Sequence, residues 1–474
     1  MTPLPSAQIC ERARLARDPR FDGLFFIGVL TTGIYCRPIC PARMPLERNV
    51  RYFRTAAAAQ DEGYRPCLRC RPDQAATLPP YSIASEAVIR ALKLIDGGML
   101  NEAPISALAD KIGVGVRQLN RLFRTELGAP PKSIARMRRA ALARQLIDST
   151  VVPFAEVANA AGYQSLRRFN DEIRSVFRRS PRELRAKRES SRTAPTQRIE
   201  LRLPIRKPYP ADWVIAFLAR RAIPGLEIVD GDVYRRRLPR ALGDDAWLEA
   251  RIGESALHVS MPANAARDTA ASLARVRRIF DLDADPQPVG THLSTSDRLA
   301  PLVASMPGIR VPGAWDGFEL AVRAILGQQV SVERATRLTE KLILAHGNDG
   351  FPCADALARE NPAAIGIPGA RGGAIQELAR RVAAGDVDLS EAMDSGTLRE
   401  SLCSVPGIGP WTAEYIALRA GRDPDAFPDS DWVVLKVLET TAAGARKLAE
   451  AWRPWRAYAL MYLWLAASRA KAAG

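Results

Sequence analysis

Hydrophobic residues recur every three to four positions over most of this chain, and the clearest repeat lies within residues 81–188. Leu108-Ala109 with Gly113 returns 49 residues later as Val157-Ala158 with Gly162. Each unit continues into a basic amphipathic helix, whose apolar positions are Val116, Leu119, Leu122 and Phe123 in the first unit and Leu166, Phe169, Ile173 and Phe177 in the second. This repeated pattern predicts a tandem helix-turn-helix.

Other patterns divide the rest of the chain. Alternating apolar residues in 199–203 and 256–260 predict short strands, and from residue 297 onward the pattern is almost wholly helical. Leu78-Pro79-Pro80 is typical of a linker, and so is the polar stretch 187–196. A chain of 474 residues is too long for one core. We expect a multidomain, mainly α protein, with a small zinc-bound α/β domain at 1–77, a helical tandem helix-turn-helix domain at 81–188, a linker at 189–197, an α/β subdomain at 198–290 and an all-helical core at 291–474.

Four of the seven cysteines form two close pairs. Cys36 and Cys40 are separated by 26 intervening residues from Cys67 and Cys70, and each pair lies near a proline. This two-knuckle spacing is typical of one Zn²⁺ held by four thiolates. A purely structural zinc ribbon is the alternative, and it is the commonest use of such spacing.

The net charge of +16 is concentrated in the first part of the chain, where residues 1–190 hold 32 Lys and Arg against 18 Asp and Glu. A basic region favours a nucleic acid partner, because neutralised phosphates release counterions. Arginine-rich genomic composition is the alternative explanation. No apolar run approaches the ~20 residues of a membrane span, and the start of the chain lacks a secretory signal. We therefore expect a cytoplasmic protein with no membrane partner.

The cysteine segment carries motifs of a known family. Thr31-Thr32-Gly33-Ile34-Tyr35-Cys36-Arg37-Pro38 and Arg65-Pro66-Cys67-Leu68-Arg69-Cys70 resemble the amino-terminal domain of Ada-type alkylation-response proteins over residues 7–77. The resemblance implies that Cys36 accepts a methyl group irreversibly from a methylphosphotriester in DNA. A zinc-bound thiolate is a suitable nucleophile, and its methylation removes one negative charge from the centre. Weaker repulsion of the DNA backbone then makes one repair event a switch for DNA binding.

The two helix-turn-helix units resemble the DNA-binding domain of AraC-type regulators, the second module of Ada proteins. In each unit the second helix would enter the major groove. We assign phosphate contacts to Arg174, Arg178 and Arg179. For any single residue, a solvated basic helix face is the alternative. The candidates for base contacts are Arg117, Gln118, Asn120 and Arg121 in the first unit and Gln164, Arg167, Arg168 and Asn170 in the second.

A different DNA-binding motif lies within residues 401–415. Pro406-Gly407-Ile408-Gly409 is the hairpin of a helix-hairpin-helix, in which Gly407 and Gly409 let backbone amides approach a phosphate. Segment 198–474 resembles the inducible 3-methyladenine DNA glycosylases (AlkA type) of the helix-hairpin-helix superfamily, with further matching runs at 318–328 and 452–460. The resemblance implies an enzyme that flips a damaged nucleotide out of the duplex and hydrolyses its N-glycosidic bond.

The same resemblance assigns the catalytic carboxylate to Asp431 and an aromatic cleft to Trp411, Tyr415 and Trp464. A base methylated on a ring nitrogen is cationic and is attracted to aromatic faces, while an ionised carboxylate stabilises an oxocarbenium-like sugar. Without the resemblance, helix capping is the better explanation of Asp429 and Asp431, and core packing that of the tryptophans. The resemblance favours catalysis for Asp431 and leaves Asp429 a structural or capping residue.

Three features bear on the expected reactions, and the last two are departures from the related families. Lyase-competent members carry a lysine just after the hairpin, where this chain has Trp411, so we expect a monofunctional enzyme that leaves an abasic site. Gln329 stands where the family inserts a leucine wedge into the gap left by the flipped base, and either Gln329 or a neighbour would fill that gap. The Pro-Cys-His-Arg motif of the Ada methyltransferase is absent, since Cys353 precedes Ala354.

Three functions remain open at this point. The chain is a sensor-regulator fused to a glycosylase, acting on double-stranded DNA at damaged sites and promoters. Alternatively, it is a transcriptional regulator whose glycosylase-like part is an inactive DNA-binding platform, or a zinc-stabilised glycosylase whose first 190 residues only tether it to DNA. The presence of Asp431 with the aromatic set favours the first over the second. We expect a monomer, with RNA polymerase as a further partner of the regulator.

Overall fold

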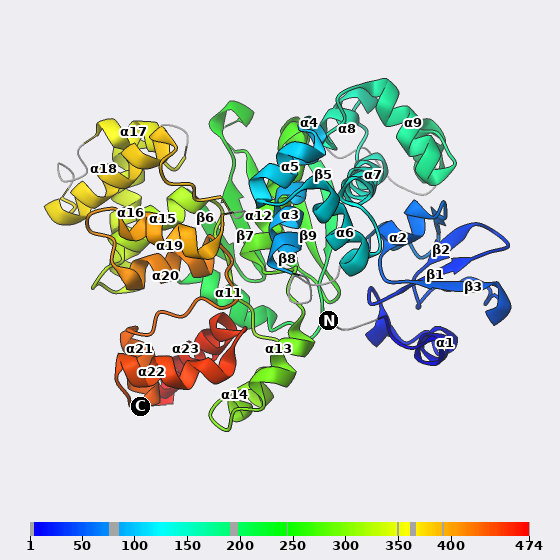
Figure 1. The fold of residues 1–474 in the computed structure, drawn as a ribbon. Coiled ribbons are helices and arrows are strands. Elements are labelled where there is room, and N and C mark those ends of the chain that lie inside the picture. Colours follow the sequence, from blue (N-terminus) through cyan, green and yellow to red (C-terminus); the bar gives the residue numbers. More distant parts are fainter. Residues whose placement is uncertain are drawn as a thin grey trace. The chain divides into compact units, whose positions relative to one another are not determined.

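The computed structural model describes residues 4–74, 85–189, 198–243, 245–347, 350–360, 366–390 and 393–473. The expected linker at Leu78-Pro79-Pro80 lies outside these residues, as does 190–197 of the second linker. The expected mainly helical, multidomain architecture is confirmed (Figure 1). Contacts divide the chain into two compact units, Met1–Ile205 with Ser255–Ala274 and Arg206–Glu254 with Arg275–Gly474. No described helix is long and apolar enough to cross a bilayer.

A small sheet opens the first unit, with its strands in the order β3-β1-β2-β4. Successive residues of a strand face opposite sides, so Phe26 packs against the alanines of α2 while Ile27 packs against Cys10 and Ala13 of α1. β2 pairs with β4 in parallel, which brings the two cysteine-bearing segments together. The elements are α1 (Ala7–Leu15), β1 (Phe26–Val29), β2 (Ile34–Cys36), β3 (Val50–Phe53), α2 (Ala56–Asp61) and β4 (Arg65–Pro66).

Two helix-turn-helix units follow, built around the long helix α7. In the first unit, α5 ends at Gly113, whose φ of +79° suits glycine and turns the chain before α6 begins. The order of exposed and buried positions is the same along α6 and α9. The helices are α3 (Glu86–Asp96), α4 (Met99–Glu102), α5 (Ile105–Ile112), α6 (Val116–Leu127), α7 (Pro131–Ser149), α8 (Phe154–Ala160), α9 (Leu166–Phe177) and α10 (Pro181–Glu189).

Two of the apolar positions that define the helical period of these helices are exposed. Val116 keeps 36% of its surface exposed and Leu166 45%, whereas Leu119 and Phe169, three residues further along, are fully buried. Val116 and Leu166 are the first residues of α6 and α9. A first-turn position satisfies the helical period without lying under a neighbouring element, so the period alone does not show whether such a residue is buried.

The segment 198–290 contributes to both units. β5 (Arg198–Pro204) pairs antiparallel with β9 (Ala256–Pro262), with Leu201 opposite Val259, and this pair belongs to the first unit. In the second unit β6 (Glu227–Asp230), β7 (Val233–Arg237) and β8 (Trp247–Ile252) form an antiparallel meander. The strands expected from the alternating residues are therefore present, as β5 and β9.

Helices make up the remainder of the second unit. α15 is almost completely buried, and the side chain of Asp316 caps its first turn by accepting a hydrogen bond from the Glu319 amide. The helices are α11 (Ala211–Ala219), α12 (Thr269–Ile279, which begins in the first unit), α13 (Pro286–Leu293), α14 (Ala300–Ser305), α15 (Gly317–Leu326), α16 (Val332–His346), α17 (Ala354–Arg359), α18 (Gly369–Ala384), α19 (Ser395–Cys403), α20 (Pro410–Arg419), α21 (Trp432–Leu438), α22 (Ala442–Ala449) and α23 (Arg456–Ala473).

A buried ion network fixes α15 against β6 and β7. Arg236 donates to both carboxylate oxygens of Glu319, at 3.1 and 2.6 Å. Arg323, one turn along α15, donates to Glu319 at 3.1 Å and to Glu227 at 3.2 Å. Burial opposes the charge of Glu319, but Arg236 and Arg323 outweigh it and lower the pKa of Glu319. The network thereby positions the end of α15. The residues that follow this helix line a cleft in the second unit.

Candidate active site and metal centre

The predicted hairpin joins α19 to α20 in the second unit. Gly407 has a φ of +89°, and a Cβ there would lie 2.7 Å from the Cβ of Ala374, so the turn requires glycine. Gly409 is the N-cap of α20. Both glycines are exposed, so the amides at the start of α20 can meet a phosphate.

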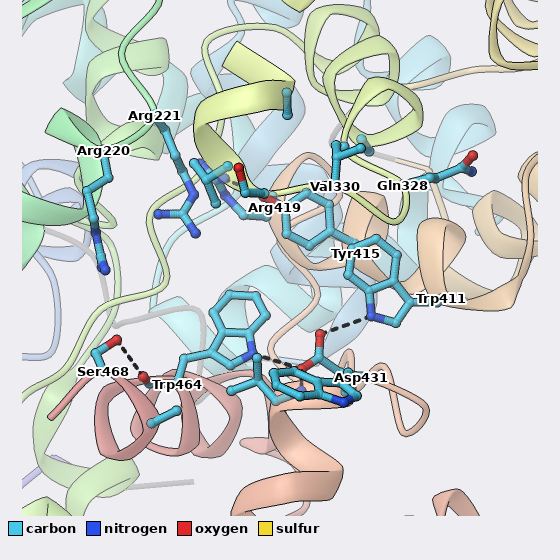
Figure 2. A pocket seen from close by; sticks show the side chains of 18 of the residues that line it. Arg220, Arg221, Gln328, Val330, Trp411, Tyr415, Arg419, Asp431, Trp464 and Ser468 are labelled. Carbon is cyan, nitrogen blue, oxygen red and sulfur yellow. Dashed lines mark hydrogen bonds between the residues drawn. The ribbon is translucent and has the colours of Figure 1, made fainter. Parts of the chain in front are cut away.

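Asp431 is the N-cap of α21 and is only 6% exposed. Its Oδ1 accepts hydrogen bonds from the amides of Val433 and Val434, at 3.0 and 3.1 Å, and from the indole Nε1 of Trp464 at 3.3 Å. Its Oδ2 accepts one from Nε1 of Trp411 at 3.0 Å (Figure 2). Four donors fix the carboxylate, yet Oδ2 has a single donor and keeps capacity for another proton donor. Capping and a place in the cleft are therefore combined in one residue.

Aromatic rings surround this carboxylate. Trp411 and Tyr415 lie one turn apart on α20 and stack, with ring centres 5.4 Å apart and planes 6° apart. The ring centre of Trp464, on α23, lies 6.4 Å from the ring centre of Tyr415. The structure thus brings the four residues assigned to catalysis and base binding into one cleft (Figure 2). Trp432, which sequence reasoning missed, lines the same cleft and is 66% exposed.

Arginines form another part of the cleft lining. Arg419 donates to the hydroxyl of Tyr415 at 2.9 Å, and Arg221 also lines the cleft (Figure 2). Burial alone would raise the pKa of Tyr415, but the charges of Arg419 and Arg221 lower it to about 8. Burial also lowers the pKa of Arg221, to about 10. Neither arginine was a sequence candidate. Nothing in the sequence links position 221 to the segment around Asp431, whereas Arg419 lies four residues after Tyr415 and could have been found from the helical spacing.

Gln329 lies in the loop after α15 and is exposed at the cleft. Its φ of +54° is left-handed, a conformation that costs a non-glycine residue about 1–2 kcal/mol. The preceding residue, Gln328, anchors the loop by donating from Nε2 to the Gly407 carbonyl at 2.9 Å and to Thr412 Oγ1 at 3.1 Å. Arg371 donates to the Gln328 carbonyl. The loop is thus tied to the hairpin, with Gln329 presented beyond it.

Asp429, the second acidic residue before α21, does not cap that helix. Its Oδ2 accepts a hydrogen bond from Nε of Arg446 in α22 at 2.7 Å. Of the two roles left open for Asp429, the structure places it in an ion pair, while Asp431 makes the capping hydrogen bonds.

The four predicted zinc ligands meet in the first unit. Their sulfurs all lie within 4.8 Å of one another, and those of Cys40 and Cys67 are 3.9 Å apart. A tetrahedral site with Zn–S bonds of about 2.3 Å has sulfur–sulfur edges of about 3.8 Å, so the donor set fits zinc. Cys36, at the end of β2, is partly exposed, whereas Cys40, Cys67 and Cys70 are buried. The four thiols form the expected tetrathiolate site.

The residues proposed to contact DNA from the two helix-turn-helix units differ in their surroundings. Arg117, Gln118 and Arg121 on α6 are exposed, as are Arg167 and Arg168 on α9. Asn120 differs, because its side-chain amide donates to the carbonyl of Val116 within α6 at 2.9 Å. Gln164 donates to the carbonyl of Asn101 at 3.4 Å. In this structure both amides are engaged within the protein.

Comparisons with known proteins agree with this architecture. Three family models match in succession: the metal binding domain of Ada over residues 9–73, a helix-turn-helix domain over 108–187 and the AlkA N-terminal domain over 200–316. These matches and the fold define an Ada-type zinc domain and regulator joined to an AlkA-type glycosylase fold, as the sequence predicted.

Full-length similarity then settles the family. The chain is 41% identical to a protein of Mycobacterium tuberculosis described as a probable bifunctional transcriptional activator/DNA repair enzyme AlkA, over 96% of this chain and 95% of that protein. It is 36% identical to DNA-3-methyladenine glycosylase 2 of Escherichia coli, over 54% of this chain and 94% of that one. The E. coli bifunctional transcriptional activator/DNA repair enzyme Ada shares 38% identity, over 28% of this chain and 36% of its own length. The chain belongs to the family of bifunctional transcriptional activator/DNA repair enzymes AlkA.

Proposed function

We propose that the second unit hydrolyses the N-glycosidic bond of alkylated bases of the 3-methyladenine type in double-stranded DNA. The arrangement of Asp431 carries this proposal. A capping aspartate needs only the two backbone amides of its helix, yet Asp431 also receives the indole N–H groups of Trp411 and Trp464 from two other helices. Those extra donors hold the carboxylate beside the aromatic faces. The named activities of the AlkA relatives support the same reaction.

The cleft suits each stage of this hydrolysis. A flipped, cationic base is attracted to the rings of Trp411 and Tyr415. When its bond to C1′ breaks, the base leaves with the bonding electron pair as a neutral molecule, and the carboxylate of Asp431 stabilises the positive sugar. Water then forms the new bond to C1′ and loses a proton, for which Oδ2 of Asp431 is the acceptor.

Base excision without strand cleavage is part of the proposal. Trp411 stands two residues after Gly409 of the hairpin, and it has no amine to form a Schiff base with the sugar. Lys436 also lines the cleft, with its Nζ 5.3 Å from the ring centre of Trp432. Borohydride trapping tests this point, and we expect no covalent adduct with wild-type protein. An adduct that disappears in Lys436→Met would show that the enzyme has lyase activity.

The first unit is proposed to act on DNA once per molecule. The Cys36 sulfur attacks the methyl carbon of a methylphosphotriester, a C–S bond forms, and the C–O bond breaks with its electron pair passing to the phosphate oxygen. Bound zinc keeps the thiols deprotonated at neutral pH. Cys36 is the cysteine of the four whose residue is partly exposed, within a cluster that is itself buried. The lost negative charge favours binding of the helix-turn-helix units to promoter DNA, and we propose a monomer that recruits RNA polymerase.

The rate of base release tests the proposed glycosylase activity. Wild-type protein should release 3-methyladenine from methylated DNA, and Asp431→Asn should be slower by about 10²- to 10³-fold, comparable to the loss of a key electrostatic group in other active sites. Asp429→Asn is the matched control, because Asp429 pairs with Arg446 on the adjacent helix. No release by either protein would favour a regulator with an inactive platform, whereas equal release by both would show that Asp431 is not the catalytic group.

A further inference from the structure

A pair of exposed hydrophobic side chains occupies the same place in both helix-turn-helix units. Val116 and Leu166 are the first residues of α6 and α9, which are 12 residues long each. A single exposed hydrophobic residue needs no explanation, since much of any protein surface is apolar. Recurrence at the equivalent position of two units, within the same order of buried and exposed residues, does need one.

The charges around this pair indicate what kind of partner would contact it. Arg117 follows Val116, and Arg167 and Arg168 follow Leu166, all of them exposed. Neither α6 nor α9 has an acidic residue in its first turn, although acidic residues stabilise that part of a helix. An apolar group within a positive surface suits the major groove at an A·T pair, where the thymine methyl group lies between phosphate strands.

The two helices are also held by one common support. α7 is 19 residues long, which corresponds to about 28 Å, and it packs against α6, α8 and α9. Arg136 of α7 donates to Ser175 of α9 at 2.8 Å, and Arg139 pairs with Glu172 of α9 at 3.5 Å. Both first turns are therefore parts of one body, held against the same helix.

We propose that Val116 and Leu166 each select a thymine by van der Waals contact with its 5-methyl group, at two separate positions of one DNA site. The inference rests on the proposed regulatory function. It divides recognition between apolar side chains, which detect the methyl groups, and neighbouring arginines, which bind phosphates or base edges.

Deoxyuridine substitution tests the proposal, because it removes the methyl group and leaves base pairing unchanged. A duplex would be selected from random DNA by the zinc-loaded full-length chain after methylation of Cys36 by methylphosphotriester DNA, and each of its thymines would then be replaced singly. We expect two positions at which replacement weakens binding about fourfold, the effect of burying one methyl group. Val116→Ser should abolish the response at one position and Leu166→Ser at the other. Leu344→Ser, at a position on α16 that is 81% exposed, should leave both responses intact.

The outcomes separate this inference from the function on which it rests. A selected duplex without any methyl-sensitive thymine, or with responses that persist in both serine variants, would contradict the thymine contacts while leaving regulation in place. Failure to enrich any sequence would contradict sequence-specific regulation, and the thymine contacts with it. Val116→Ala and Leu166→Ala, which favour the helix, repeat the test if a serine variant loses helix content.

Discussion

The sulfur centre of the first unit and the carboxylate cleft of the second hold their reacting atoms in opposite ways. Asp431 is buried and receives hydrogen bonds from groups on α20, α21 and α23. Cys36 is the partly exposed member of a site that also draws on the turns after β2 and β4. Hydrolysis would leave Asp431 unchanged, whereas methyl transfer would consume Cys36. In the proposed reactions the carboxylate of Asp431 is used in every turnover, and several helices fix its position. The sulfur of Cys36 is used once, and it needs contact with DNA and a negative charge.

The largest expected effect is the loss of one activity while the other is retained. Cys36→Ser should reduce methyl uptake from methylphosphotriester DNA from one methyl group per chain to none, because the nucleophilic sulfur is gone. The same variant should release 3-methyladenine at the wild-type rate, and Asp431→Asn should show the reverse. Labelled methyl transfer and base release, measured on the same preparations, check both. Uptake by Cys36→Ser would show that another cysteine is the acceptor.

The support of the cleft can be weakened without touching its lining. Arg236→Met leaves Glu319 buried beside Arg323 alone, and loss of one partner from such a pair costs about 3–5 kcal/mol. The free energy of unfolding of the second unit, measured in urea, should fall by that amount. Methyl uptake at Cys36 should not change. A loss below about 1 kcal/mol would mean that the network does not fix α15.

Much of the site could be predicted, and the reasons differ between residues. Trp411 and Tyr415 are four residues apart, so any helix there places them on one face. The position of Arg221 could not be predicted, because its approach to Tyr415 depends on the packing of distant segments. The sequence likewise does not show which of the 52 acidic residues pairs with Arg236, or which of the 68 basic residues pair with Glu319. Val116 shows the limit of periodicity, which does not tell whether a first turn is covered.

A smaller change probes how the carboxylate is held. Trp464→Phe keeps an aromatic ring in the cleft but removes the 3.3 Å hydrogen bond to Oδ1 of Asp431. Hydrogen bonds to charged groups contribute about 1.5–3 kcal/mol, so single-turnover base release should slow by roughly tenfold or more. Trp452→Phe is the control, since Trp452 donates to Ser296 at 3.2 Å and not to Asp431. Unchanged release by Trp464→Phe would show that the indole only packs.

The smallest effect concerns the pH dependence of the cleft. Tyr415 has a pKa of about 8 in the folded protein, below the ordinary value of 10, because Arg419 and Arg221 outweigh the effect of burial. Its contribution to stability is therefore absent below pH 8, grows as the pH rises from 8 to 10, and is complete above that range. The difference in unfolding free energy between wild type and Tyr415→Phe should increase over this interval. Tyr462→Phe should show no such increase, because burial raises the pKa of Tyr462. An equal pH dependence for Tyr415→Phe and wild type would mean that the arginines do not favour the phenolate, and the positive part of the cleft would then lack the strength assigned to it here.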